Sequence, residues 1–338
     1  MCKHIKCTFC TNAEMRKVTD EMREITVSLF GKGDFTDIQS AIDSVGEEEK
    51  QTTIYIREGV YRNRVNVNKP GIRMIGLGRV IITYGIGAVH KDFYGKEYGT
   101  FRTETVSIAA PDFSAENITF VNSAGPGNVA GQALALYIRA DRVRFRKCRF
   151  IGNQDTIYTG NPKEAGFECR NGIEHRQYYE DCYIEGDVDF IFGNGTAIFR
   201  RCEIYSVDRH EKEGGNNGYI TAASTNPETK YGYLFINCRL TSSGAKNTVY
   251  LGRPWRDAAN VVFADCHMGA HIKPEGWHNW GKPEREATSR YCEWGSTGPG
   301  GENADRVSWA KQIPEEEQKA MLPEAILRGD DGWDINEW

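Results

Sequence analysis

Long hydrophobic runs and a strong excess of charge of either sign are both missing from this sequence. No run of apolar residues approaches the roughly 18 that a membrane-spanning helix needs. The 338 residues include 42 Lys and Arg against 47 Asp and Glu, a formal net charge of −5. Without a basic excess, the chain lacks an electrostatic footprint for nucleic acid or for an anionic membrane surface. We therefore expect a globular protein with neither nucleic acid nor membrane as its partner.

A secretory signal is also missing from the first residues. Residues 1–7 carry charges, but no apolar stretch follows them. Ten cysteines in 338 residues do not by themselves indicate a disulfide scaffold. We therefore expect a cytoplasmic location, with secretion as the alternative.

One short pattern recurs five times between residues 143 and 268. In each copy an aromatic residue is followed three positions later by Cys and five positions later by an apolar residue. The aromatic residues of successive copies lie 34, 20, 36 and 28 positions apart. The copies are Val143/Phe145/Cys148/Phe150, Gln177/Tyr179/Cys182/Ile184, Ala197/Phe199/Cys202/Ile204, Tyr233/Phe235/Cys238/Leu240 and Val261/Phe263/Cys266/Met268, and an imperfect earlier copy holds Phe113, Ile118 and Phe120.

Each copy alternates with period two, as residues 142–146 show, and this alternation is typical of a half-buried strand. A constant strand motif separated by loops of variable length indicates a solenoid, in which stacked repeats share one core. Propeller blades would each need four strands. We therefore predict an all-β fold, a parallel β-helix, which is right-handed because parallel crossovers are right-handed.

Both ends of this β-helix are expected to be covered. Residues 34–45 have apolar positions at helical spacing and predict an N-terminal capping helix. From about residue 283 the alternation fades, and residues 315–328 are predicted to be helical within a C-terminal capping segment. The expected organisation is an N-terminal extension (1–24), a β-helix catalytic domain (25–282) and a C-terminal capping segment of the same domain (283–338).

Two acidic residues fall at the same position of neighbouring repeats. Asp155 follows Cys148 by seven residues, and Asp189 follows Cys182 by seven. If these coils stack in register, their backbones lie ~4.8 Å apart. The same overlay pairs Gly152 with Gly186, Ile157 with Ile191, and Tyr158 with Phe192.

Two carboxylates at this distance cannot both ionise cheaply, so one is expected to hold a proton while the other is anionic. An acid and a nucleophile or base then coexist at one pH. The alternative is structural, because stacked Asp side chains can also satisfy the amides of turns.

Four segments of the sequence resemble the signature segments of the pectin methylesterases (pectinesterases), in that family's order. The resemblance extends over about residues 25–335 and includes Gly298-Pro299-Gly300 near the C-terminus. The four segments are Gln132-Ala133-Leu134-Ala135-Leu136, Gln154-Asp155-Thr156, Asp189-Phe190-Ile191-Phe192-Gly193 and Leu251-Gly252-Arg253-Pro254-Trp255.

The resemblance implies an enzyme that hydrolyses the methyl esters of galacturonate residues in pectin or oligogalacturonides and releases methanol. It implies Asp189 as the nucleophile that forms an acyl-enzyme, Asp155 as the general acid and then base, Gln132 and Gln154 as oxyanion donors, and Arg253 as the partner of Asp189. This chemistry requires neither a metal nor a cofactor. The sequence also lacks a Gly-x-Ser-x-Gly elbow, which argues against a serine esterase.

A sugar chain offers apolar ring faces, which aromatic side chains can bind. Trp255, Tyr158 and Phe192 are therefore the predicted substrate-binding aromatics, although any of them can instead belong to the core. Val188 and Ala223 are weaker candidates for contacts along the same groove. We expect the protein to act as a monomer.

Two other functions remain open. The protein could be another β-helical pectin-active enzyme, a lyase or a polygalacturonase, because paired carboxylates also suit glycosyl transfer. It could also be a β-helix that only binds carbohydrate, with the acids capping turns.

Other histidines and cysteines are weak candidates for a site. The cluster Cys2, His4, Cys7 and Cys10 has short zinc-like spacing but no second ligand pair, so we expect no metal. His267 and His271 are four apart in a strand pattern and are interpreted as structural. In some members of the resembled family the positions of Cys182 and Cys202 form a disulfide, and in a reducing compartment both would remain thiols.

Overall fold

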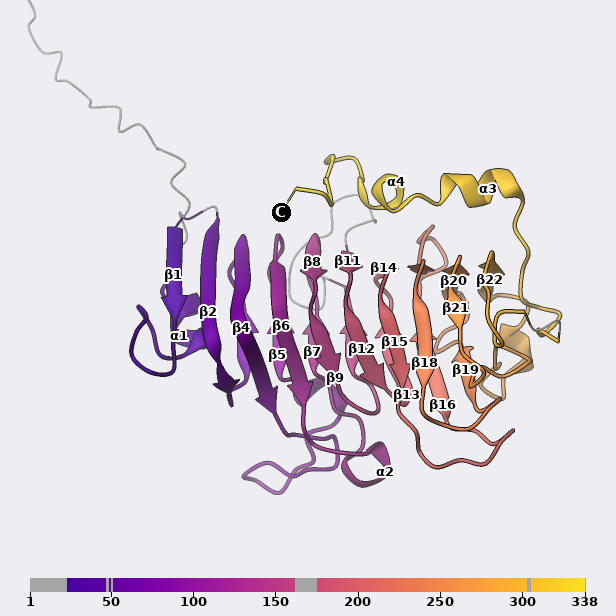
Figure 1. The fold of residues 1–338 in the computed structure, drawn as a ribbon, viewed down its shortest axis with the longest axis horizontal. Coiled ribbons are helices and arrows are strands. Elements are labelled where there is room, and N and C mark those ends of the chain that lie inside the picture. Colours follow the sequence, from indigo (N-terminus) through magenta and orange to yellow (C-terminus); the bar gives the residue numbers. More distant parts are fainter. Residues whose placement is uncertain (1–22, 47–48, 50, 162–174, 303–304, 338) are drawn as a thin grey trace, which may run out of the picture.

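The computed structural model describes residues 23–46, 49, 51–161, 175–302 and 305–337, and these form a rod of stacked parallel coils (Figure 1). The strands pair in parallel throughout the two main sheets, as predicted for a parallel β-helix. Residues 1–22, which include the Cys2, His4, Cys7 and Cys10 cluster, lie outside the described residues.

The first sheet contains the longer strands and the cysteine repeats. Its members are β1 (Arg23–Val27), β2 (Thr52–Tyr61), β4 (Ile72–Tyr84), β6 (Ser114–Asn122), β8 (Val143–Arg146), β9 (Arg149–Ile151), β11 (Arg176–Glu180), β12 (Tyr183–Gly186), β14 (Thr196–Arg200), β15 (Glu203–Ser206), β17 (Tyr233–Ile236), β18 (Arg239–Ser242), β20 (Asn260–Ala264), β21 (His267–Met268) and β22 (Arg290–Trp294).

The second sheet contributes one strand per coil and carries the pocket described below. Its members are β3 (Val65–Val67), β5 (Val106–Ile108), β7 (Leu136–Ile138), β10 (Ile157–Thr159), β13 (Val188–Gly193), β16 (Gly218–Ala223) and β19 (Val249–Gly252).

The five predicted repeats stack in the register that their sequences indicate. Tyr179 pairs with Phe145 on one side and with Phe199 on the other, and Phe235 continues the row to Phe263. Successive rings in this row stack with centroids 4.4–5.0 Å apart. Like residues therefore cover like residues along the core, and the interior is a continuous aromatic ladder.

Each repeat cysteine follows a residue in the left-handed backbone conformation. These residues are Lys147, Asp181, Arg201, Asn237 and Asp265, with φ between 50° and 54°. Such a residue bends the chain sharply between two short strands, such as β8 and β9, at a cost of roughly 1 kcal/mol or more. The bend turns the following cysteine inward, and all five repeat cysteines, Cys182 and Cys202 among them, are buried free thiols.

The N-terminal end is closed by the short helix α1 (Ile38–Asp43), as predicted. Asp37 caps it by accepting a hydrogen bond from the Ser40 amide at 2.8 Å, and this cap starts the helix later than residue 34. Ile38 and Ile42 are buried against the first coils. In the described part of the chain, further short helices lie in loops: α2 (Gly127–Ala130), η1 (Thr100–Arg102) and η3 (Pro283–Arg285).

The segment from residue 283 onward does more than close the C-terminal end. It adds β22 to the first sheet and then runs back along the outside of that sheet as α3 (Glu315–Ala320) and α4 (Pro323–Leu327) (Figure 1). The expected helix 315–328 is thus divided near Pro323, which cannot continue a preceding helix. The division into domains at residue 282 stays a prediction.

The tail follows this path because the outer face of the first sheet is partly apolar. Apolar side chains of α4 and the residues after it bury the outward-facing side chains of four neighbouring strands. The cluster contains Ile326, Leu327 and Ile335 of the tail and Tyr178, Ile198, Leu234 and Val262 of the sheet.

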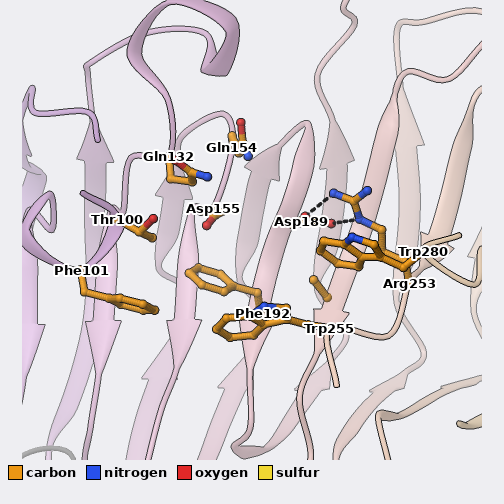
Figure 2. Close-up of a pocket in the computed structure, with 11 residues that line it drawn as sticks. Thr100, Phe101, Gln132, Gln154, Asp155, Asp189, Phe192, Arg253, Trp255 and Trp280 are labelled. Carbon is orange, nitrogen blue, oxygen red and sulfur yellow. Dashed lines mark hydrogen bonds and ion pairs between the residues drawn. The ribbon is translucent and has the colours of Figure 1, made fainter. Parts of the chain in front are cut away.

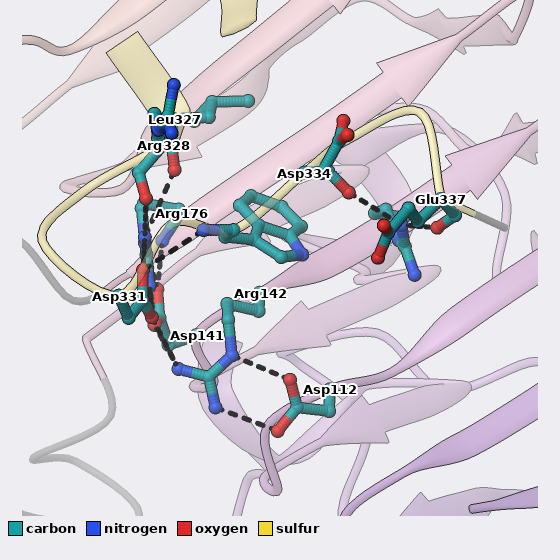
Figure 3. A network of polar contacts seen from close by, with 11 residues as sticks. Asp112, Asp141, Arg142, Arg176, Leu327, Arg328, Asp331, Asp334 and Glu337 are labelled. Carbon is teal, nitrogen blue, oxygen red and sulfur yellow. Dashed lines mark hydrogen bonds and ion pairs between the residues drawn. The ribbon is translucent and has the colours of Figure 1, made fainter. Parts of the chain in front are cut away.

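A buried ion-pair network fixes the tail to the sheet (Figure 3). Arg176 is only 2% exposed and pairs with Asp141 and Asp331, each at 2.6 Å from its Nη2 atom. Its Nη1 atom also donates to the carbonyl of Leu327 at 3.0 Å. The guanidinium of Arg176 holds the pKa of Asp331 well below its usual range. One cation therefore joins residues nearly two hundred positions apart in the sequence.

We predict that Arg176→Met lowers the free energy of unfolding by about 3–5 kcal/mol, because it leaves the buried Asp141 carboxylate without its main partner. Urea unfolding followed by circular dichroism measures the change. The matched control is Arg200→Met, whose partner Glu324 is exposed, and its expected cost is below about 1 kcal/mol. Equal effects of the two substitutions would contradict a special role of the buried network.

Candidate active site

A pocket of about 210 Å³ opens on the outer face of the second sheet (Figure 2). Polar side chains gather on one wall and aromatic side chains on the other. It is lined by Thr100, Phe101, Gln132, Gln154, Asp155, Asp189, Phe192, Ala222, Arg253, Trp255 and Trp280. All five predicted catalytic residues therefore reach one cavity, although they come from four segments of the chain.

The two acids lie on neighbouring coils. Strands β10 and β13 pair with Ile157 beside Ile191, which is the register that the sequence overlay predicts. The Asp155 amide donates to the carbonyl of Val188 at 3.0 Å, directly beside Asp189. The acids are 7% and 6% exposed. Two carboxyls are thus held close together and almost out of water.

Both aspartates have the left-handed backbone conformation, with φ of 64° at Asp155 and 51° at Asp189. Asp tolerates this conformation better than most residues, but it still costs energy. At Asp189 it coincides with a shift in the pairing of β13 with β16, so Phe190 and Ile191 both enter the core while Asp189 lines the pocket. Backbone strain at these two residues presents the carboxyls to the cavity.

Arg253 directly follows β19, two strands beyond β13 in the second sheet, and its side chain binds Asp189. Its Nε and Nη2 atoms donate to the two carboxylate oxygens at 2.8 and 2.6 Å, a bidentate pair (Figure 2). The guanidinium lies between the rings of Tyr219 and Trp280, 3.8 and 3.7 Å from their centroids. These cation–π contacts fix the plane of the guanidinium and so the orientation of the Asp189 carboxylate.

The environment separates the pKa values of the two acids. Burial raises the pKa of Asp155 well above its usual range, and the negative charge of Asp189 adds to this effect, while Arg253 opposes it. Burial also raises the pKa of Asp189, and the hydrogen-bonded guanidinium of Arg253 offsets only part of this rise. A third buried carboxyl, Asp187, disfavours ionisation of both. Asp155 therefore holds its proton more tightly than Asp189 does.

Gln132 and Gln154 lie on the same side of the pocket, close to Asp155 (Figure 2). Backbone hydrogen bonds anchor both residues: the Gln132 carbonyl accepts from the Ala88 amide at 2.8 Å, and the Gln154 carbonyl accepts from the Ala133 amide at 3.1 Å. The side-chain amides can then donate to an oxygen atom bound beside the acids.

The predicted substrate-binding residues divide into three groups. Phe192 and Trp255 line the pocket, with ring centroids 5.8 Å apart. Tyr158 is 5% exposed and lies next to Phe192, centroids 4.9 Å apart, but it does not line the cavity. Val188 is half-buried and lies outside the lining.

Ala223 requires a correction. It is fully buried in the main core, and its neighbour Ala222 lines the pocket instead. Successive side chains of a strand point to opposite faces, so a difference of one residue moves the contact from pocket to core. Ala222 pairs with Phe192, which already faces the pocket, and this pairing is the signal that identifies it.

Sequence reasoning also missed Thr100, Phe101, Trp280 and Tyr219. The first three lie in loops outside the repeats, where the periodic pattern gives no position. Tyr219 is in β16, and its role comes from contact with a cation that is distant in sequence. For Phe101, Trp280 and Tyr219 only their aromatic character could have pointed to a role, and Thr100 had no such signal.

No group of three or more potential metal ligands occurs among the residues that the structure describes. His267 is exposed on β21, and His271 is buried, with burial lowering its pKa to about 4.

We predict that the Asp155 carboxyl stays protonated at pH values where an ordinary Asp is ionised. Burial and the Asp189 charge disfavour its anion, so the proton is lost only above the usual range. Difference infrared spectroscopy during a pH titration detects the carbonyl band of a protonated carboxyl. That band should be missing in Asp155→Asn and present in Asp112→Asn, which removes a surface carboxyl that is 47% exposed. A titration of Asp155 near its ordinary value of 3.8 would contradict the prediction.

Comparisons with known proteins find similar sequences and similar structures. The family model described as Pectinesterase matches residues 24–329. Pectinesterase 31 of Arabidopsis thaliana is 38% identical over 305 residues, covering 87% of this chain and 89% of that protein. A pectin methylesterase solved in complex with a hexasaccharide has 29% identity and a TM-score of 0.78, covering 93% of this chain and 98% of that one. Pectin methylesterase from carrot has 29% identity and a TM-score of 0.77, covering 91% and 93%.

Proposed function

The chain belongs to the pectinesterase family, and we propose that Asp189, Asp155 and Arg253 form the centre of its active site. The protein is a carboxylic ester hydrolase that removes methyl groups from methylated galacturonate residues of pectin and releases methanol. The observation that carries the assignment of residues is the buried acid pair, in which one carboxyl binds Arg253 and burial raises the pKa of the other well above its usual range.

The first half of the reaction transfers the acyl group to the enzyme. The ionised Asp189, oriented by Arg253, attacks the carbonyl carbon of the ester and forms a tetrahedral intermediate. Asp155 then gives its proton to the departing methoxide, because methoxide is a poor leaving group. Methanol leaves, and an acid anhydride joins the galacturonate carbonyl to Asp189.

The second half restores the enzyme. Asp155, now anionic, accepts a proton from a water molecule, whose oxygen attacks the carbonyl carbon of the anhydride. The bond to Asp189 breaks, and the products are a free galacturonate carboxyl and an ionised Asp189. Asp155 ends protonated, so atoms and charges balance over the cycle and each residue is ready for another turnover.

Gln132 and Gln154 are proposed to bind the developing oxyanion through their side-chain amides. Both line the pocket on the side where Asp155 lies. A well-placed donor of this kind contributes on the order of 3 kcal/mol to the barrier reduction.

The proposed substrate is a polymer or oligomer of methylated galacturonate. Phe192, Trp255 and Phe101 give the pocket a wall of aromatic rings, which suits the apolar faces of sugars. The fold neighbour solved with a hexasaccharide supports a chain of several sugars that passes through the site. A pocket of about 210 Å³ leaves most of such a chain outside, on the surface of the second sheet.

The cellular location and the oligomeric state of the protein remain predictions from the sequence. No helix in the described part of the chain is long and apolar enough to cross a membrane. The cytoplasmic location expected from the sequence stays a prediction, with secretion as its alternative. Action as a monomer likewise stays a prediction from the sequence.

We predict that Asp189→Asn lowers methanol release from methylated pectin by at least about a thousandfold, because a neutral amide cannot act as the nucleophile. The mutated protein should keep its circular dichroism spectrum. A matched control is Asp181→Asn, which changes an exposed left-handed residue at the bend before Cys182.

The product distinguishes the esterase from the two alternatives. The wild-type protein should release methanol without creating new reducing ends or unsaturated ends. New chain ends would indicate a polygalacturonase or a lyase, and binding of pectin without any product would indicate a carbohydrate-binding protein. An active Asp189→Asn variant would refute the proposed nucleophile.

We predict that Arg253→Gln shifts both limbs of the pH–rate profile to higher pH. The guanidinium lowers the pKa values of Asp189 and Asp155, so its removal raises both. Asp189 then ionises only at higher pH, which moves the acid limb upward, and Asp155 keeps its proton to higher pH, which moves the alkaline limb upward. Residual activity of Arg253→Gln, measured as methanol release across pH with Arg200→Gln as the control, reports the shift. An unchanged acid limb would show that Arg253 does not set the ionisation of Asp189.

A further inference from the structure

A rigid hairpin with two exposed aromatic residues stands on the rim of the pocket. Residues 88–99, in the loop between β4 and β5, fold back on themselves: the Tyr98 amide donates to His90, and the Gly99 amide donates to Ala88, each at 2.9 Å. At the tip, Phe93 and Tyr94 are 95% and 88% exposed. Their rings pack edge to face, with centroids 5.4 Å apart.

The base of this hairpin is continuous with the proposed active site. The Ala88 amide donates to the carbonyl of Gln132, and the chain that leaves the hairpin forms η1, whose Thr100 and Phe101 line the pocket. Figure 2 shows these two residues at the end of the pocket opposite Arg253. The hairpin therefore extends the pocket wall beyond the cavity.

The tip is held by polar contacts and not by apolar packing. The Asp92 carboxylate accepts hydrogen bonds from the amides of Tyr94 and Lys96, both at 3.0 Å. Arg102 donates to the carbonyl of Tyr98 at 2.8 Å and pairs with Asp92 at 3.4 Å. The backbone of the tip is thus held in a fixed turn, so little backbone conformational entropy remains to be lost when a ligand binds.

Exposed apolar side chains lead from the tip back toward the pocket. Val89, beside the hairpin base, is 47% exposed, and Val129 of the neighbouring α2 is 69% exposed. The two segments are in contact, because the Val89 amide donates to the carbonyl of Ala130. Phe101, where this strip enters the pocket, is 43% exposed. We call these exposed apolar side chains the apolar strip, although the polar residues 90–92 separate Val89 from the tip. Several exposed apolar groups gathered beside a pocket mark a binding surface more often than single ones do.

We propose that this apolar strip, from Phe101 through Val89 and Val129 to Phe93 and Tyr94, is a distal binding surface for the methylated galacturonan chain. The inference rests on the proposed function. Methyl-esterified rings lack the carboxylate charge and offer apolar faces, and aromatic side chains suit such faces. Lys91 and Lys96, both exposed near the tip, can bind the free carboxylates of partly demethylated segments. The strip binds sugar units several positions away from the ester that reacts.

A distal surface has a different kinetic effect from a residue at the reacting ester. It contributes equally to binding of the ground state and the transition state, so its loss should raise KM and leave kcat unchanged. The effect should also depend on chain length, because a short oligomer that fills only the pocket does not reach the tip.

The test is the double substitution Phe93→Ala/Tyr94→Ala. For long, highly methylated pectin we expect KM to rise about tenfold with unchanged kcat, which corresponds to the loss of two aromatic contacts. For a methylated trigalacturonide we expect kcat/KM to remain within twofold of the wild type. Tyr94→Phe should behave like the wild type, because it keeps the ring.

The control is Leu322→Ala, which removes an apolar side chain that is 55% exposed on the C-terminal tail, over the other sheet. Unchanged KM for long pectin in the double variant would overturn the proposal. An equal loss on long and short substrates would also overturn it, since it would show damage to the pocket itself.

Affinity electrophoresis through a pectin gel measures binding without turnover and separates this inference from the proposed function. If the wild type releases no methanol but is retarded by pectin, and the double variant is retarded less, the distal surface stands while the proposed function fails. If both proteins are retarded equally, the inference fails whatever the activity. A double variant that loses self-association on a sizing column but binds pectin normally would assign the tip to a second copy of the chain and overturn the proposal.

Discussion

Parallel hydrogen bonding between β10 and β13 is the constraint on which the site depends, because it fixes the distance and orientation of the two acids. Ile157 and Ile191 are buried side by side in the core, so a slip of one residue would expose both and bury polar groups in their place. The core therefore determines the register, and the register places Asp155 one coil away from Asp189. The same hydrophobic stacking that stabilises the rod also aligns the reacting groups.

Electrostatics then assigns the two acids different protonation states. Arg253 makes two hydrogen bonds to Asp189 and none that the structure describes to Asp155, so its charge stabilises one carboxylate more than the other. Tyr219 and Trp280 hold the guanidinium between their rings. A flexible cation could move between the two acids and make their pKa values similar, whereas a cation stacked between two rings cannot. Rigidity of the arginine is thus part of the acid–base chemistry.

Much of this arrangement is predictable from the sequence because repeats carry their own register. The spacing of Cys148 and Cys182 is enough to align the two coils that carry the acids, and the structure has the same alignment. The overlay of these two repeats does not reach β16, where the pairing with β13 is irregular, so the sequence gives no register that would distinguish Ala222, which lines the pocket, from the predicted Ala223. Phe101 and Trp280 lie in loops of irregular length, and the repeat pattern does not predict where residues of such loops are placed.

The two sheets have different outer surfaces for a related reason. The apolar outer face of the first sheet is covered by the C-terminal tail, which Arg176 fixes in place, so this face is committed to stability. The second sheet carries a separate aromatic cluster beside the pocket, which the tail does not cover, and Phe101 at its edge is 43% exposed. A polymer that lies along the axis of the rod crosses a new coil about every 4.8 Å, the separation of neighbouring strands. Loops inserted between coils, such as the hairpin at residues 88–99, can therefore lengthen the binding surface without disturbing the register that holds the acids together.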